Sequence, residues 1–254
     1  MSTILYEIRD RVAYITLNRP DKSNAINAEM NDELFNTFRD VRNNPDVWVA
    51  VITGSGRSFS AGGDLLHTED QDKVPSEQEA PYHLYECIMN IWKPTVAALN
   101  GSCIAQGAGI ALACDIRIAS ERAQFGWPQV KRGFSSVSGP VILARMIPHN
   151  KALEILYTGD FIDAQEAYRL NMVNTVVPHE QLAAATENFA RGILKNAPLA
   201  MRAIKEVTIR GHDSSLADHV RLAALAHEAL KRSADYQEGI NAFREKRDPK
   251  WHGR

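Results

Sequence analysis

The sequence predicts an α/β fold in which strands, turns and helices recur, followed by a helical region. Apolar runs of strand length occur at residues 47–53, 96–99 and 116–119, as expected for strands that are buried on both faces. The first two runs lead into glycine-rich segments, and strand, turn and helix follow one another several times. From Leu182 onward the pattern becomes almost entirely helical.

The first elements are two short strands and a helix. Residues 5–9 and 12–17 alternate apolar and polar side chains around Asp10-Arg11, which predicts a hairpin. Residues 28–41 carry apolar side chains at helical spacing and stop before Asn43-Asn44-Pro45, so we expect an amphipathic helix against the sheet.

The later elements follow the same pattern. Helices are expected over residues 107–114 and 164–170 and a strand over 173–177, while the polar, acidic stretch 68–79 is expected to be an exposed loop. Gly211-His212-Asp213 is the one clear break that we predict in the helical tail. We place a core domain at residues 1–195 and a C-terminal helical region at 196–254.

Composition excludes several classes of protein. A chain of 254 residues can bury a sizeable core, and a net charge of −2 gives no general attraction for nucleic acid or anionic membranes. No apolar run approaches the ~20 residues of a membrane span. The three cysteines show neither a disulfide nor a zinc pattern, so we expect no metal, no membrane span and a cytoplasmic location.

Two small-residue segments are the most informative part of the chain. They cover residues 59–65 (FSAGGDL) and 100–109 (NGSCIAQGAG), and each follows a strand-like run. Two backbone N–H groups that converge on one oxygen require close approach of main chains, which small side chains allow. The pair therefore predicts an oxyanion hole and chemistry on an acyl thioester.

Over nearly its whole length the chain resembles the crotonase, or enoyl-CoA hydratase/isomerase, superfamily. The resemblance rests on the order and spacing of several motifs: LNRP at 17–20, NAIN at 24–27, FSAGGDL at 59–65, KPTVAALNG at 93–101, ACDIRIA at 113–119, AQFG at 123–126, LYTGD at 156–160 and AFREKR at 242–247. It implies a spiral of repeated ββα units, a C-terminal helical region that packs in trimers, often paired as hexamers, and a coenzyme A thioester as substrate, with no further cofactor.

The resemblance also assigns the two donors of the oxyanion hole. Gly63 provides the first backbone N–H, and Gln106, followed by Gly107, provides the second at the start of a helix. A glycine triplet of the family becomes Ala105-Gln106-Gly107 here, so the Gln106 side chain must turn away from the pocket or into it. The structural alternatives are that Gly62-Gly63 forms a turn with Asp64 as a helix cap, and that the second segment only allows helix packing.

The same resemblance suggests where coenzyme A would lie. Backbone groups of Ala61 and Leu65 match positions that face the adenine, and the loop 22–25 matches one that passes the nucleotide. Lys22 or Lys246 could meet a phosphate, although an isolated lysine is usually only solvated. The predicted substrate-binding residues are Lys22, Ala25, Ala61, Asp64, Leu65 and Lys246.

The acids of the family's hydratases are missing from this chain. Their two glutamate positions correspond to Gly109 and Gln129, and an acid position of other branches corresponds to Val137. Glutamine can orient water but cannot exchange a proton near neutral pH. The titratable or phenolic candidates for a replacement are His67, His83, Tyr85 and Glu86. His83 and Glu86 are three residues apart and share a helical face, so they form either an acid/base pair or an exposed polar edge with Leu84, Cys87, Ile88 and Ile91 facing the core.

These observations leave several functions open. The leading one is an enzyme that stabilises a thioester enolate and directs it to hydration, dehydration or double-bond migration. Thioester hydrolysis, decarboxylation and non-catalytic acyl-CoA binding remain alternatives, because the glutamates are absent. A dinucleotide fingerprint fails at Leu112, and residues 133–137 lack the last glycine of a nucleophile elbow. The serines of 131–140 either bind polar substrate atoms or cap a helix.

Overall fold

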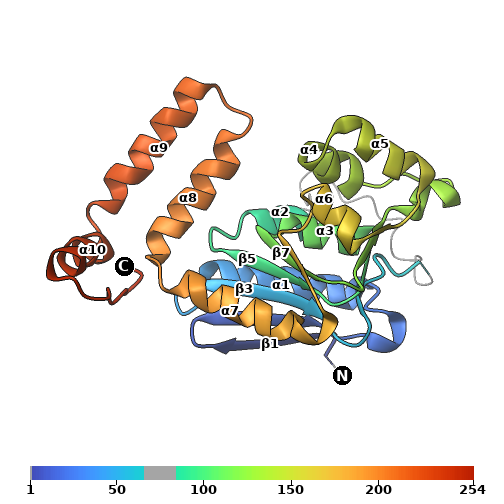
Figure 1. Cartoon of the computed structure of the whole chain (residues 1–254), viewed down its shortest axis with the longest axis horizontal. Coiled ribbons are helices and arrows are strands. Elements are labelled where there is room, and N and C mark those ends of the chain that lie inside the picture. Colours follow the sequence, from blue (N-terminus) through green and yellow to red (C-terminus); the bar gives the residue numbers. More distant parts are fainter. Residues whose placement is uncertain (1, 66–83) are drawn as a thin grey trace.

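A computed structural model describes residues 2–65 and 84–254 and contains two β-sheets (Figure 1). The larger sheet has the strand order β1-β2-β3-β5-β7-β10. β1 pairs antiparallel with β2, and the other neighbours pair parallel. Its strands are β1 (Ile4–Arg9), β2 (Val12–Leu17), β3 (Val49–Gly54), β5 (Thr95–Leu99), β7 (Ile116–Ser120) and β10 (Thr175–Val177).

A second sheet of short strands shows that the chain winds as a spiral. Its strands, in the order β4-β6-β8-β9, are β4 (Ser58–Ser60), β6 (Ser102–Ile104), β8 (Gln124–Gly126) and β9 (Ile162–Asp163). The successive pairs β3/β4, β5/β6 and β7/β8 each give one strand to the large sheet and the next to the small sheet. The predicted α/β class and the spiral of ββα units are therefore confirmed.

Helices cover both faces of the large sheet (Figure 1). On one face, side chains such as Ala13, Ile15 and Leu17 pack with α1 and α3, and on the other face Val12, Val49 and Val51 pack with α7. This burial on both sides explains why the parallel strands are continuous apolar runs. The helices of this part are α1 (Ala28–Asn43), α2 (Leu84–Met89), α3 (Gln106–Ala113), α4 (Ala144–Met146), α5 (His149–Thr158), α6 (Ala164–Arg169) and α7 (Leu182–Leu194), with 3-10 or π turns at Pro20–Lys22, Pro128–Arg132, Gly139–Leu143 and His179–Gln181.

The C-terminal region consists of α8 (Pro198–Gly211), α9 (Leu216–Leu230) and α10 (Ala234–Glu245), which extend away from the sheets in Figure 1. The predicted break after Gly211 is confirmed. The prediction that it is the one clear break is wrong, because α9 ends at Leu230 and the Ser233 hydroxyl accepts the Tyr236 N–H at 3.1 Å to begin α10. Serine is a favoured N-cap, and that signal marks the turn in the sequence.

Two other predictions concern the acidic stretch 68–79 and the absence of a membrane span. The stretch 68–79 lies outside the described residues. Among the helices that the structure does describe, not one combines the length and the apolar character that crossing a membrane requires.

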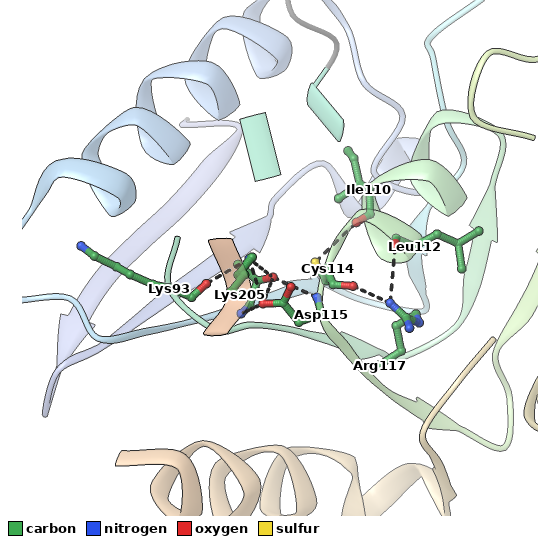
Figure 2. Close-up of polar contacts among 8 residues, drawn as sticks. Lys93, Ile110, Leu112, Cys114, Asp115, Arg117 and Lys205 are labelled. Carbon is green, nitrogen blue, oxygen red and sulfur yellow. Dashed lines mark hydrogen bonds and ion pairs between the residues drawn. The ribbon is translucent and has the colours of Figure 1, made fainter. Parts of the chain in front are cut away.

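A buried lysine, Lys205, connects α8 to the large sheet (Figure 2). The Lys205 ammonium lies 2.8 Å from the Asp115 carboxylate and donates to the carbonyl of Lys93 at 3.0 Å. The Lys205 side chain is 7% exposed, and burial lowers its pKa although Asp115 acts in the opposite direction. Asp115 also accepts the backbone N–H of Thr95 at 2.8 Å, so one carboxylate joins the start of β5, the start of β7 and α8.

Arg117 stabilises the end of α3 in the same region (Figure 2). Its guanidinium donates to the carbonyls of Cys114 at 2.5 Å and Leu112 at 3.4 Å, and to Met172 at 2.5 Å. The last carbonyls of a helix lack partners within the helix, so a cation there satisfies them and interacts favourably with the helix dipole. Arg117 therefore fixes the position of α3, whose first residue is Gln106.

Lys205→Ala tests the role of this anchor. Removing the ammonium leaves the partly buried Asp115 carboxylate without its cation, so the free energy of unfolding should fall by about 3 kcal/mol in a denaturant titration. The control is Lys231→Ala, which removes a solvent-exposed ion pair to Glu228 and should leave the stability almost unchanged, because exposed pairs are screened by solvent. Equal losses in the two variants would contradict the anchor role.

Candidate active site

The two small-residue segments meet at one cleft of about 550 Å³. The first segment contributes Ala61, Gly63 and Leu65, and the second contributes Ile104, Ala105 and Gln106. The remaining lining comes from Tyr85 of α2, from residues 128–138 and from Phe161. Within 128–138, the residues that line the cleft are Pro128, Gln129, Arg132, Phe134, Ser135, Ser136, Val137 and Ser138.

The loop 22–27 holds the first segment in place. Asn24 is fully buried and its side-chain amide donates to the carbonyls of Ser58 at 2.8 Å and Phe59 at 3.2 Å. The Ser60 hydroxyl donates to the Asn24 carbonyl at 2.8 Å and accepts the Gly62 N–H at 3.1 Å. These contacts explain why the motif at 24–27 accompanies the motif at 59–65.

An isolated parallel bridge orients Gly63. Ile26 donates to the Gly62 carbonyl at 2.8 Å, and Asp64 donates to the Ile26 carbonyl at 2.9 Å. Neighbouring N–H groups of an extended segment point to opposite sides, so the Gly63 N–H is turned away from Ile26. Within residues 2–65 and 84–254, the structure records no acceptor for it.

The second segment begins α3 with an unusual backbone. Ala105 has φ 51° and ψ −112°, a conformation that costs a residue with a side chain about 1–3 kcal/mol. Its N–H donates to the Gly126 carbonyl at 2.9 Å, which holds the turn to β8. The first N–H groups of a helix have no partner within the helix, and for Gln106 no acceptor is recorded in the described part of the chain.

The two segments approach each other main chain to main chain. A Cβ on Gly62, which has φ 89°, would lie 2.7 Å from the Ile104 carbonyl oxygen and 3.2 Å from the Gln106 nitrogen. A Cβ on Gly107 would lie 2.6 Å from the Ser60 Cβ and 2.7 Å from the Ser60 carbonyl oxygen. Only glycine fits at these two positions, and this contact brings the residues Gly63 and Gln106 to the lining of the same cleft.

Gln106 turns its side chain toward the cleft. Its Oε1 lies 3.5 Å from the place where a Cβ on Gly63 would be, and the residue lines the cleft. Of the two orientations that the sequence leaves open, the structure therefore has the inward one. The side-chain amide lies beside the backbone donors and adds a polar group that a glycine at this position would lack.

Gln129 lies in the cleft wall with an unsatisfied oxygen. The residue belongs to the 3-10 turn Pro128–Arg132 and is 9% exposed. Its Oε1 has no hydrogen-bond partner in the described structure. A buried acceptor without a partner is costly, and this oxygen is the unsatisfied buried side-chain atom among the described residues of the cleft wall.

Tyr85 fills the space beside Gly109. A Cβ on Gly109 would lie 2.3 Å from the Tyr85 Cε1 and 2.6 Å from the Ser138 Cβ, so no larger residue fits without rearrangement. Burial raises the pKa of the Tyr85 phenol to about 12, and a hydrogen bond with Ser138 acts in the opposite direction. Of the replacement acids considered from the sequence, the described structure places Tyr85 in the cleft, whereas Glu86 is exposed and does not line it.

The other predicted residues have different positions. His67 and His83 lie outside the described residues. Lys22 is exposed, and the Ala25 carbonyl accepts a hydrogen bond from Arg19, beside the first segment but not in the cleft lining. Asp64 is buried and pairs with Arg19 at 3.0 Å, so it supports the turn behind the cleft.

Lys246 does not line the cleft of its own chain. It is exposed at the end of α10, which Figure 1 shows at the left end of the molecule, beyond α8 and apart from α2 and α3. The prediction grouped it with Lys22 and Ala61, and within one chain the structure does not bring these residues together. The reason is that α9 and α10 extend outward instead of folding back over the sheets.

The serines of 131–140 serve structural and lining roles. The Ser136 hydroxyl accepts the Gly139 N–H at 3.0 Å and so holds the turn before the helical segment Gly139–Leu143, although the N-cap of that segment, Ser138, makes no capping hydrogen bond. Ser138 is 1% exposed, accepts the Trp127 indole N–H at 3.0 Å and donates to the Ala105 carbonyl at 3.1 Å. Sequence reasoning did not single out Ser138, because its contacts with Trp127 and Ala105 join positions that are 11 and 33 residues away along the chain.

Gly109→Ala tests the packing of Tyr85. The added methyl group overlaps the ring and the Ser138 Cβ, so the free energy of unfolding should fall by about 1–3 kcal/mol. In Gly192→Ala, within α7, the added Cβ meets no atom within 4 Å, so the same change should raise stability by up to about 1 kcal/mol. Denaturant titration of both variants gives the comparison, and a stable Gly109→Ala protein would contradict the packing.

Comparisons with known proteins agree with this architecture. A family model described as enoyl-CoA hydratase/isomerase matches residues 7–254. The chain is 37% identical over 257 residues to (E)-benzylidenesuccinyl-CoA hydratase of Thauera aromatica, covering 98% of this chain and 99% of that protein. It is 37% identical over 247 residues to carnitinyl-CoA dehydratase of Citrobacter koseri, covering 94% of each. The crystal structure of enoyl-CoA hydratase from Mycobacterium tuberculosis H37Rv superimposes with a TM-score of 0.91 at 32% identity, covering 100% of both chains. The chain belongs to the enoyl-CoA hydratase/isomerase family, the crotonase superfamily whose motifs it carries.

Proposed function

We propose that the cleft binds the thioester of an acyl-CoA and that the backbone N–H groups of Gly63 and Gln106 together hold its carbonyl oxygen. The observation that carries this proposal is that Gly63 and Gln106, whose backbone N–H groups have no recorded acceptor in the described structure, line the same cleft. The protein would then act as an enzyme of the hydratase/isomerase type on an enoyl-CoA or a related thioester.

The physical argument concerns the charge that develops during the reaction. Adding water to the double bond of an enoyl thioester, or removing a proton next to the carbonyl, places negative charge on the carbonyl oxygen. Donors that are already fixed in position stabilise this charge without reorganisation. Gln106 is the first residue of α3, so the positive end of the helix dipole adds to the effect.

The remaining groups support a coenzyme A ester as the ligand. Ala61 and Leu65 line the cleft next to Gly63, and the Ala61 N–H is bonded to the Ser23 carbonyl at 2.9 Å in the loop that also carries Lys22. An exposed lysine near this entrance could meet a phosphate of the nucleotide. Gln129 would accept a hydrogen bond from water or from a hydroxyl on the acyl group.

The relatives indicate which reaction to test first. Two similar proteins are named as a hydratase and a dehydratase of CoA esters, so hydration of a 2-enoyl-CoA, or its reverse, is the leading proposal. One observation keeps hydrolysis, decarboxylation and non-catalytic binding as alternatives: none of the described residues that line the cleft carries a carboxylate.

The C-terminal helices support assembly as a homotrimer, or as a hexamer of two trimers. Large apolar side chains are exposed on them, including Leu216 at 80%, Leu225 at 64% and Phe243 at 86%. Exposed apolar groups concentrated on one region are typical of contacts between subunits. The three cysteines are free thiols, in keeping with our proposal of a cytoplasmic protein.

Gly63→Pro tests the oxyanion hole, because proline has no N–H to donate. Turnover of the best substrate among 2-enoyl, 3-enoyl and 3-hydroxyacyl-CoA esters should fall by about 10²–10³-fold. Gly63→Ala is the matched variant, since it keeps the N–H and its Cβ meets the flexible Gln106 side chain at 3.5 Å. It should lose much less activity. Circular dichroism must show that both variants are folded, and full activity in Gly63→Pro would contradict the assignment.

Phe243→Asp tests the assembly. A charge at this exposed apolar position should weaken the contact between subunits, so light scattering should give a smaller mass for the variant than for the wild-type protein. Leu5→Asp, on β1 and 51% exposed, is the control that should leave the mass unchanged. A wild-type protein that is monomeric at all concentrations would contradict the proposal.

A further inference from the structure

A second cavity, of about 490 Å³, adjoins the cleft. Gln129, Phe134, Ser135 and Ser136 line both cavities, so the two spaces meet at these residues. The volume lies in the range of about 300–1,000 Å³ that is common for small-molecule sites. A ligand that passes the four shared residues from the cleft therefore enters a space large enough to receive a further part of it.

The lining of the second cavity suits a hydrocarbon. Its walls include the side chains of Trp127, Leu153 and Leu156, and its described lining contains no Asp, Glu, Lys or Arg side chain. The cleft itself is lined by polar groups such as Gln106 and Arg132. Apolar groups gain free energy when they leave water for an apolar surrounding, so the second cavity favours the apolar end of a ligand.

One wall of the second cavity is held by close packing. A Cβ on Gly139 would lie 2.3 Å from the Leu156 Cδ2 and 3.3 Å from the Trp127 Cδ1. Trp127 is 1% exposed, and its indole N–H donates to the Ser138 hydroxyl at 3.0 Å. This wall is already in place without a ligand, which lowers the cost of binding.

The boundary between the two cavities is a segment without regular structure. Residues 134–136 belong to neither a helix nor a strand, and a Cβ on the preceding Gly133 would meet no atom within 4 Å. The Phe134 N–H donates to the Gln129 carbonyl at 3.3 Å, and the Phe134 side chain is 45% exposed. A segment with an exposed side chain and open space beside it can adjust to a chain that passes it.

The proposed thioester position gives the direction of the chain. Gly63 and Gln106 line the cleft and are not among the lining residues of the second cavity. An acyl group begins at the carbonyl carbon that these donors would hold. A short acyl group ends within the cleft, whereas a longer one reaches the shared residues and continues beyond them.

We propose that the second cavity receives the end of the acyl chain and that the ligands are acyl-CoA esters with an apolar chain of medium length, such as octanoyl or 2-octenoyl esters. The proposal rests on the proposed function, because the thioester held in the cleft determines where the chain begins. It adds the class of acyl group to that function.

The observation that favours an acyl chain over a second copy of this chain is the continuity of the two cavities. Val130 and Tyr157 are 46% and 71% exposed at the second cavity, and exposed apolar side chains also occur where subunits meet. The residues shared with the cleft link this space to the ligand that the cleft would hold.

Calorimetric titration of the full-length protein with free coenzyme A, butyryl-CoA and octanoyl-CoA tests the proposal. These saturated esters show binding without turnover. Each buried methylene group lowers Kd by up to about fourfold, so octanoyl-CoA should bind at least about tenfold more tightly than butyryl-CoA. The ratio of kcat/KM for 2-octenoyl-CoA and 2-butenoyl-CoA should favour the longer ester in the same way.

Ala144→Phe fills the second cavity, because Ala144 lines it and does not line the cleft. The variant should lose most of the preference for octanoyl-CoA and change the Kd of butyryl-CoA by less than about twofold. Leu153→Trp is a second filling variant with the same expected effect. Ala183→Phe, at an exposed position of α7 on the other face of the large sheet, is the matched control and should keep the preference. Circular dichroism shows which variants are folded.

The outcomes separate this inference from the proposed function. Esters that bind equally well whatever their length, or filling variants that weaken both esters equally, would overturn the inference and leave the thioester site in place. A wild-type protein that neither binds nor converts any ester would overturn the proposed function and the inference with it. A smaller mass of Ala144→Phe in light scattering, with an unchanged preference for octanoyl-CoA, would overturn the inference by assigning the cavity to a contact between copies of this chain.

Discussion

The site depends on one steric constraint, which is that two main-chain segments must touch without side chains between them. Gly62 meets the peptide of Ile104 and Ala105, and Gly107 meets Ser60. Any Cβ at these two glycines would lie less than 3 Å from backbone atoms of the other segment. Because the contact is between backbones, the proposed donors Gly63 and Gln106 are held more firmly than flexible side chains would be.

The rest of the fold maintains this contact. The first segment is held from one side by Asn24 and Ser60, and the second begins a helix whose far end is capped by Arg117. The strained backbone of Ala105 is kept by hydrogen bonds at both its N–H and its carbonyl. Strain that is retained in this way is typical of functional sites, and here it turns the start of α3 toward the cleft. The same carbonyl accepts the hydroxyl proton of Ser138 at 3.1 Å, so the buried serine supports the start of α3.

Much of this arrangement could be predicted from the sequence, and the exceptions have physical reasons. Strands that are buried on both faces give unbroken apolar runs, so β3, β5 and β7 were evident. The strands of the small sheet span two or three residues, too few for any periodicity to mark them. The motifs identified Gly63, Gln106 and Gln129 by position, and the structure places all three in the cleft lining. The position of Tyr85 beside Gly109 could not be predicted, because it depends on how α2 packs on α3. Lys246 was predicted to belong to the site, but within one chain it lies apart from the cleft. The direction in which α10 extends depends on packing and could not be predicted from the residues of α10.

A crystal structure with a bound acyl-CoA, such as butyryl-CoA, tests the central claim most directly. The account predicts that the thioester oxygen lies about 2.7–3.1 Å from the backbone nitrogens of both Gly63 and Gln106, the range of an oxyanion-hole hydrogen bond. A thioester oxygen that contacts neither nitrogen, or an acyl-CoA bound at a different cleft, would contradict the account.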